Sequence, residues 1–100
     1  MSAGPARDLA RTWRLHVPGY LVEVYIPRSR IEDAQAAGLR VRALAEQCCR
    51  EGMPVRHVRT TFVPGDETCF LFFEAASEEA VGELCRRAAI DSPRIVLAEE

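Results

Sequence analysis

The sequence predicts an α+β domain in which strands and helices follow the order βαββαβ. Its 100 residues, of which 48% are hydrophobic, suit one compact domain with one core. Four short segments rich in β-branched and aromatic residues have the composition of strands. Two longer segments have apolar residues at helical spacing, one after the first strand and one after the third.

The first strand is predicted at residues 20–26, where YLVEVYI alternates between two faces. Ser29 and Glu32 have the spacing of a capping box, which predicts that a helix begins there. Gly52 and Pro54 end this helix. Its apolar stripe contains Ile31, Ala34, Ala37, Gly38, Val41, Leu44, Ala45 and Cys48.

The second and third strands are predicted at residues 55–63 and 67–74, which read VRHVRTTFV and ETCFLFFE. Residues 64–66, Pro-Gly-Asp, have the chemistry of a hairpin turn between them. Asp66 and Glu67 would also suit a hard cation, but a turn needs polar residues at these positions in any case. We therefore interpret the acidic pair as part of the turn.

Ser77 is predicted to cap the second helix, because Glu78 and Glu79 follow it in the first turn. Residues 94–98, RIVLA, have the composition of a fourth strand. Two right-handed crossovers then place both helices on one face of a four-stranded antiparallel sheet. This is the ferredoxin-like arrangement, and we predict that it spans residues 20–100.

Charge and hydropathy exclude several classes of protein. The net charge is −2 at pH 7, and no basic face is indicated, so we expect no nucleic-acid partner. No apolar run is long enough for a membrane span, and the first residues lack the apolar segment of a secretory signal. We therefore expect a cytoplasmic protein without a membrane partner.

Residues 1–19 are predicted to form a basic N-terminal tail. The charged residues of this tail are Arg7, Asp8, Arg11 and Arg14. Such a tail is often loose, but Leu9 and Trp13 have the i,i+4 spacing of a short turn that packs on the domain or on a partner.

The four cysteines do not have the spacing of a zinc finger or a disulfide scaffold. Cys48 and Cys49 are adjacent, whereas Cys69 and Cys85 stand alone, and no C-x-x-C pair occurs. We therefore expect buried, reduced thiols.

The side of the sheet away from the helices, called the open face below, is predicted to be too apolar for contact with water. The residues assigned to it are Leu21, Glu23, Tyr25, His57, Arg59, Thr61, Cys69, Leu71, Phe73 and Val96. The residues assigned to the helix side are Val22, Val24, Val58, Phe62, Phe70, Phe72, Ile95 and Leu97. Monomers rarely expose apolar patches beyond a few hundred Å². We therefore predict a two-fold homodimer of the dimeric α+β barrel type, in which two open faces pack together.

This face assignment depends on the length of the loop between the second and third strands. An odd loop pairs Thr61 with Cys69 and is preferred, because it collects Phe62 and the third strand's Phe70 and Phe72 in the core. An even loop instead places Phe70, Phe72 and Glu74 on the open face and removes Cys69 from it.

Two segments resemble a known family. They are RHVRTTFVPGDETCFLFFEA at residues 56–75 and YLVEVYIP at residues 20–27. Over about residues 20–98 the chain resembles the small bacterial family DUF4242. The resemblance implies a dimeric ferredoxin-like fold and, because some members are described as nickel-binding or nickel-responsive, Ni²⁺ as a candidate ligand. Similar members often have His or Cys in place of Leu71, and this difference weakens the implied metal site.

Three side chains of the predicted open face have the donor atoms of a transition-metal site. They are Glu23, His57 and Cys69, whose carboxylate, imidazole and thiolate suit Ni²⁺, Cu²⁺ or Zn²⁺. Nickel in particular follows from the resemblance. Each also has a structural interpretation: Glu23 can pair with Arg59, His57 can be solvated or bound by a carboxylate, and Cys69 can be a small buried hydrophobe. A small dimeric metal-binding protein is the function we predict.

Two other functions remain open. A small-molecule or enzymatic cleft at the sheet face would be lined by Glu23, Tyr25, His57 and Arg59, with Thr61 as a further candidate. Alternatively, the open face serves only for dimerisation. No nucleophile elbow, phosphate loop, dinucleotide-binding turn or H-E-x-x-H motif occurs, so no catalytic residue is predicted.

Overall fold

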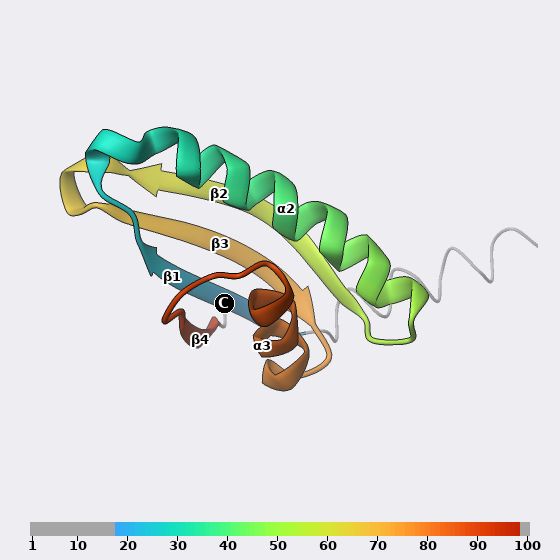
Figure 1. Cartoon of the computed structure of the whole chain (residues 1–100). Helices are drawn as coiled ribbons and strands as arrows, with labels where there is room; N and C mark the ends of the chain where they lie inside the picture. The colour runs from blue at the N-terminus through green and yellow to red at the C-terminus, as the bar shows by residue number, and fades with distance from the viewer. Residues whose placement is uncertain (1–17, 99–100) are drawn as a thin grey trace, which may run out of the picture.

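The computed structural model describes residues 18–98, which form the predicted ferredoxin-like fold (Figure 1). The sheet is antiparallel, in the order β2-β3-β1-β4. Its strands are β1 (Gly19–Tyr25), β2 (Val55–Val63), β3 (Thr68–Ala75) and β4 (Arg94–Ala98). The helices are α2 (Ile31–Arg50) and α3 (Glu78–Arg87), with short 3₁₀ turns η1 (Arg28–Arg30) and η2 (Pro64–Asp66). Both helices lie on the same side of the sheet in Figure 1.

Neither helix of the described part is long and apolar enough to cross a membrane. The predicted turn at Leu9 and Trp13, and most of the predicted tail, lie outside residues 18–98.

The two helices begin differently. The predicted capping box at Ser29 and Glu32 does not form: Ser29 lies within η1, and Arg30 occupies the N-cap position without a side-chain hydrogen bond. The reason is that the chain makes a 3₁₀ turn first, closed by the Arg30 N–H donating to the Pro27 carbonyl at 2.8 Å. The predicted cap of α3 is confirmed, since the Ser77 hydroxyl accepts a hydrogen bond from the Ala80 N–H at 3.2 Å.

The core lies between the sheet and the two helices. The predicted stripe of α2 is buried in it, apart from Ile31, which is exposed, and Leu44, which is half-buried. The core residues with no exposed surface, or almost none, are Val22, Val41, Cys48, Val55, Cys69, Leu71, Phe73, Ala75, Val81, Leu84, Cys85 and Ala88. Three of them are cysteines, as expected for reduced buried thiols, and all four cysteines are free.

The predicted odd loop between β2 and β3 is wrong. Val63 pairs with Thr68, so four residues separate them, and Glu67 turns the chain in a left-handed conformation (φ 50°). Because opposed residues share a face, β3 is inverted relative to the preferred assignment. Its buried side carries Cys69, Leu71, Phe73 and Ala75, and its open side carries Thr68, Phe70, Phe72 and Glu74.

A β-bulge then separates His57 from Arg59. His57 pairs with Phe73 and Arg59 pairs with Phe72, so Val58 is one residue more than β3 can match. Arg59 therefore lies on the open face as predicted, whereas His57 lies on the helix side. The prediction for His57 was wrong because a single extra residue reverses the alternation of a strand.

Candidate functional site: the open face of the sheet

The strand register arranges the open face in rows that cross the sheet from β2 to β4. One row contains Arg59, Phe72, Leu21 and Val96. The next row contains Thr61, Phe70, Glu23 and Arg94. The first of these rows is mostly apolar, and the second is apolar only at Phe70.

Four apolar side chains form the centre of this face, and we call them the apolar centre. They are Leu21, Phe70, Phe72 and Val96, each half-buried in the single chain. Tyr25 extends the apolar surface at the end of β1 and is 68% exposed. The prediction that the open face is rich in apolar residues is thus confirmed, although β3 contributes Phe70 and Phe72 rather than Leu71 and Phe73.

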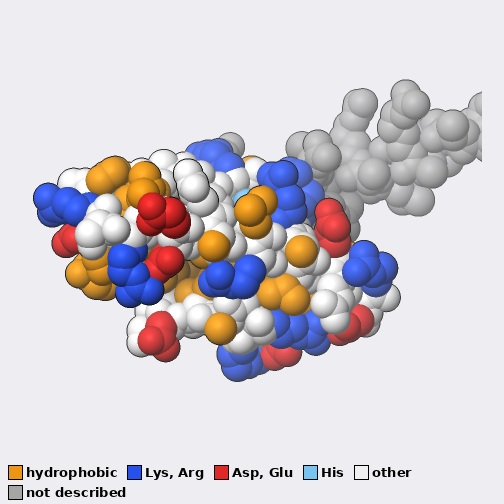
Figure 2. Space-filling view, turned by 45° about the horizontal axis from the view of Figure 1, so that its top comes forward, with side chains coloured by type: hydrophobic (Ala, Val, Ile, Leu, Met, Phe, Trp, Pro, Cys, Tyr) orange, Lys and Arg blue, Asp and Glu red, His pale blue; other side chains and the backbone are white. Residues whose placement is uncertain are grey.

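The surface over α2 differs from the open face. Figure 2 shows its apolar side chains in separate groups between Arg, Asp and Glu side chains. Single exposed apolar residues, such as Leu39 with 72% exposure, are ordinary on a soluble domain. The two sides of the molecule therefore have different surface chemistry.

Charged residues border the apolar centre. Arg56 Nε donates to Glu74 Oε1 at 2.9 Å, and Arg94 Nη1 donates to Glu23 Oε2 at 3.0 Å. The Arg59 guanidinium lies over the Phe72 ring, 4.0 Å from its centroid, which is a cation–π contact. The structural interpretation of Glu23 was an ion pair with Arg59. Glu23 does form an ion pair, but its partner is Arg94.

The structure divides the six predicted site residues between the two sides of the sheet. Glu23, Tyr25, Arg59 and Thr61 lie on the open face. His57 and Cys69 lie on the helix side, as described above for β2 and β3. The sheet itself thus separates Glu23 from the other two predicted metal ligands.

Cys69 behaves as a core hydrophobe. Its side chain has 0% exposure, and burial raises the pKa of its thiol. A thiol with a raised pKa in an apolar core is a poor metal ligand, because metals bind the thiolate.

His57 is half-buried between α2 and the sheet. Its Nε2 lies 2.8 Å from Thr60 Oγ1, and its ring is tilted against Phe73 with centroids 5.6 Å apart. Its Nδ1 is buried and has no hydrogen-bond partner among the residues that the structure describes. Burial lowers the pKa of His57, the positive charge of Arg42 lowers it further, and the backbone of Arg59 opposes this only in part.

This lowered pKa predicts a loss of stability in acid. Unfolded His57 takes up a proton near pH 6.5, whereas folded His57 does so only at lower pH. Between these values the unfolded chain binds more protons, so the free energy of unfolding falls as the pH drops below about 6.5. We expect His57→Gln to reduce this fall, measured as the difference between urea unfolding at neutral and at mildly acidic pH. An unchanged difference in His57→Gln would contradict the assignment.

The predicted metal site does not fit the structure. Among residues 18–98 no three His, Cys, Asp or Glu side chains are placed to hold one metal ion. Glu23 already pairs with Arg94, and Cys69 is enclosed in the core on the other side of the sheet. Metal binding stays a prediction from the resemblance.

Sequence reasoning missed Phe70, Phe72, Arg56, Glu74 and Arg94 as residues of the preferred open face. Phe70, Phe72 and Glu74 are on the open face in the even-loop alternative, so the length of the turn between β2 and β3 was the signal that could have identified them. Arg94 begins a strand that pairs with β1, and its partner Glu23 is directly opposite in the register.

No protein-family model, curated protein or solved structure matches this chain. The resemblance to DUF4242 therefore also stays a prediction, and the function rests on the geometry of the described residues.

Proposed function

We propose that this protein is a cytoplasmic homodimerisation module in which two copies pack open face against open face, as in dimeric α+β barrels. The apolar centre is the observation that carries the proposal. Leu21, Phe70, Phe72 and Val96 lie side by side on a sheet face that neither helix covers. Packing against a second copy would remove these four side chains from water.

The composition of the open face supports a protein–protein interface. Such interfaces combine an apolar centre rich in aromatic residues with a polar rim in which arginine is common. Here Phe70 and Phe72 lie in the centre, while Arg56 and Arg94 belong to ion pairs beside it. Arg59, which covers Phe72, adds a further arginine.

The charges favour a second copy of the chain over a strongly charged partner. A face that pairs with itself by two-fold symmetry needs both signs of charge, because each patch meets a patch of the same surface. The two ion pairs lie toward opposite edges of the sheet: Arg56–Glu74 joins β2 to β3, and Glu23–Arg94 joins β1 to β4. A dimer can therefore oppose unlike charges at both edges.

The cysteines support the cytoplasmic part of the proposal. Cys48, Cys69 and Cys85 are buried and free, and burial raises the pKa of each thiol, that of Cys85 to about 11. Thiols of this kind suit a compartment in which disulfides do not form.

Sedimentation equilibrium of the full chain tests the dimer. We expect the wild-type protein to dimerise at micromolar concentration. The double variant Leu21→Thr/Phe70→Thr should raise the dimer dissociation constant roughly tenfold or more, because it removes two central apolar side chains while keeping strand propensity. Leu39→Thr is the matched control, since Leu39 lies on α2 and is 72% exposed.

Two results would contradict the proposal. One is a wild-type chain that stays monomeric at tens of micromolar. The other is a folded Leu21→Thr/Phe70→Thr variant that dimerises as tightly as the Leu39→Thr control.

A further inference from the structure

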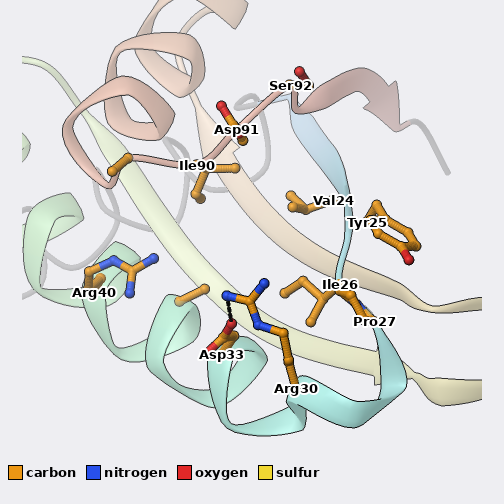
Figure 3. A pocket seen from close by; sticks show the side chains of 12 residues that line it. Val24, Tyr25, Ile26, Pro27, Arg30, Asp33, Arg40, Ile90, Asp91 and Ser92 are labelled. Atoms are coloured by element: carbon orange, nitrogen blue, oxygen red, sulfur yellow. Dashed lines mark ion pairs between the residues drawn. The ribbon is translucent and has the colours of Figure 1, made fainter.

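A pocket of about 650 Å³ lies on the helix side of the domain, away from the open face. We call it the α2–α3 pocket, because it lies between α2 and the segment that follows α3 (Figure 3). Its walls come from the end of β1, from α2 and from residues 89–92. Its volume is within the range of pockets that bind small molecules.

One face of α2 supplies the polar wall. Asp33, Ala37 and Arg40 of α2 follow the i, i+4, i+7 spacing that places residues on one side of a helix, and Arg30 precedes them at the N-cap position. Figure 3 shows the guanidinium groups of Arg30 and Arg40 extending toward the same space. Ala37 between them is small, so the pocket stays open.

The other walls are largely apolar. Val24 and Ile26 come from β1 and the residue after it, and Ile90 follows α3 (Figure 3). Ala89 and Ser92 shape the last wall with left-handed backbones (φ 56° and 46°), which residues other than glycine rarely adopt. Apolar side chains on these walls thus face the polar wall formed by Arg30, Asp33 and Arg40 (Figure 3).

Arg40 is the group in this pocket that is available to an anion. Arg30 forms an ion pair with Asp33, which neutralises both. Arg40 Nε donates to the Ala88 carbonyl at 3.1 Å, and within residues 18–98 no carboxylate lies at ion-pair distance from its guanidinium. The backbone bond orients the side chain, and its charge has no carboxylate partner in the described part of the chain.

The remaining polar groups do not oppose an anion strongly. Asp91 points to the rim in Figure 3, away from the two guanidinium groups. The carbonyls of Cys85, Arg86 and Ala88 at the end of α3 already accept hydrogen bonds from Ile90, Ala89 and Arg40. Of the two charged α2 residues that line the pocket, Asp33 is paired with Arg30, and Arg40 presents donors that have no carboxylate partner among residues 18–98.

We infer that the α2–α3 pocket binds a small organic carboxylate with an apolar body. The carboxylate lies against the terminal nitrogens of Arg40, whose planar fork matches it in geometry and charge. The body lies on Val24, Ile26 and Ile90. This site does not rest on the proposed dimer, because Arg40 and the apolar residues that would hold the ligand lie on the helix side of the sheet. Of the lining residues, Tyr25 at the end of β1 belongs to the open face.

Titration of the ¹⁵N-labelled full chain with 2-naphthoate, followed by NMR, tests the inference. We expect saturable shifts of the amides at residues 24–27, 37–40 and 89–92. The neutral isostere 2-naphthamide should bind roughly tenfold more weakly or worse, because it lacks the charge that Arg40 recognises.

Arg40→Gln should weaken 2-naphthoate binding roughly tenfold or more. Arg50→Gln is the matched control: Arg50 is exposed at the end of the same helix and does not line the pocket, so binding should be unchanged. If Arg40→Gln does not fold, Arg40→Lys replaces it, which keeps the charge but loses the planar fork and should bind more weakly than wild type.

The inference is overturned if no saturable binding occurs, if the naphthamide binds equally well, or if folded Arg40 variants bind like wild type. Shifts confined to Leu21, Phe72 and their neighbours would also overturn it, because they would place the ligand on the open face. The dimer dissociation constant of Arg40→Gln should equal that of wild type. A failure of the ligand test can therefore be distinguished from a failure of the dimer test.

Discussion

Leu71→Ala is expected to lower the free energy of unfolding by about 2–5 kcal/mol, since it removes a fully buried side chain and leaves a cavity. Leu71 has 0% exposure and lies in the middle of β3, paired with Val22 on one side and Thr60 on the other. Urea unfolding followed by circular dichroism measures the change, at one fixed chain concentration because dimerisation would add to stability.

Leu39→Ala is the control for this variant. Leu39 is 72% exposed on α2, so the same deletion should change the free energy of unfolding by no more than about 0.5 kcal/mol. The comparison also tests whether the side of β3 that carries Leu71 faces the core. If Leu71 lay on the open face, its deletion would weaken dimerisation and cost the single chain little.

Alanine substitutions at the two helical glycines are expected to have opposite effects on stability. A Cβ on Gly38 of α2 would lie 2.9 Å from Thr60 Oγ1 of β2, closer than real side chains approach. A Cβ on Gly82 of α3 would meet its nearest neighbours at 3.9 Å, which is ordinary contact. Alanine stabilises a helix by about 1 kcal/mol relative to glycine. This gain applies at both sites, so the opposite effects are expected from the difference in the Cβ contacts.

We therefore expect Gly82→Ala to raise the free energy of unfolding by about 1 kcal/mol and Gly38→Ala to lower it by about 1–2 kcal/mol. Thr60 cannot give way freely, because its Oγ1 is also 2.8 Å from His57 Nε2. Thermal and urea unfolding of the two variants measure the difference. Equal stabilisation by both would show that α2 can move away from β2 without cost.

The two helices illustrate what local pattern can predict. The apolar stripe of α2 and the Ser77 cap of α3 were both readable from the sequence, and the structure confirms them. Helical spacing and capping involve residues a few positions apart, so no distant partner is needed to recognise them. Gly38 shows the limit: helical spacing placed it in the apolar stripe, whereas its close approach to Thr60 of β2 depends on another element.

The sheet illustrates what local pattern leaves undecided. In β3, Phe70 and Phe72 alternate with Leu71 and Phe73, so both sides of the strand are apolar and neither is marked as the core. The same ambiguity affected the predicted metal site, because Cys69 lies on the same side of β3 as Leu71 and its side of the sheet was therefore not determined. The open face was nevertheless predicted to be apolar, and this holds for either assignment.

From the sequence alone came the order of elements, the ferredoxin-like fold and an apolar open face, because each follows from composition and short-range periodicity. Only the tertiary structure decided which side of β3 is buried, where His57 lies and which charges border the apolar centre. The physical reason is that a four-residue turn and one bulged residue each reverse which side of a strand faces the core. Neither Glu67 in the turn nor Val58 in the bulge is a residue type that indicates such a feature in the sequence. The α2–α3 pocket was likewise decided by the tertiary structure, since Arg40 and Ile90 line one pocket only because α2 and the segment after α3 lie on the same side of the sheet (Figure 1).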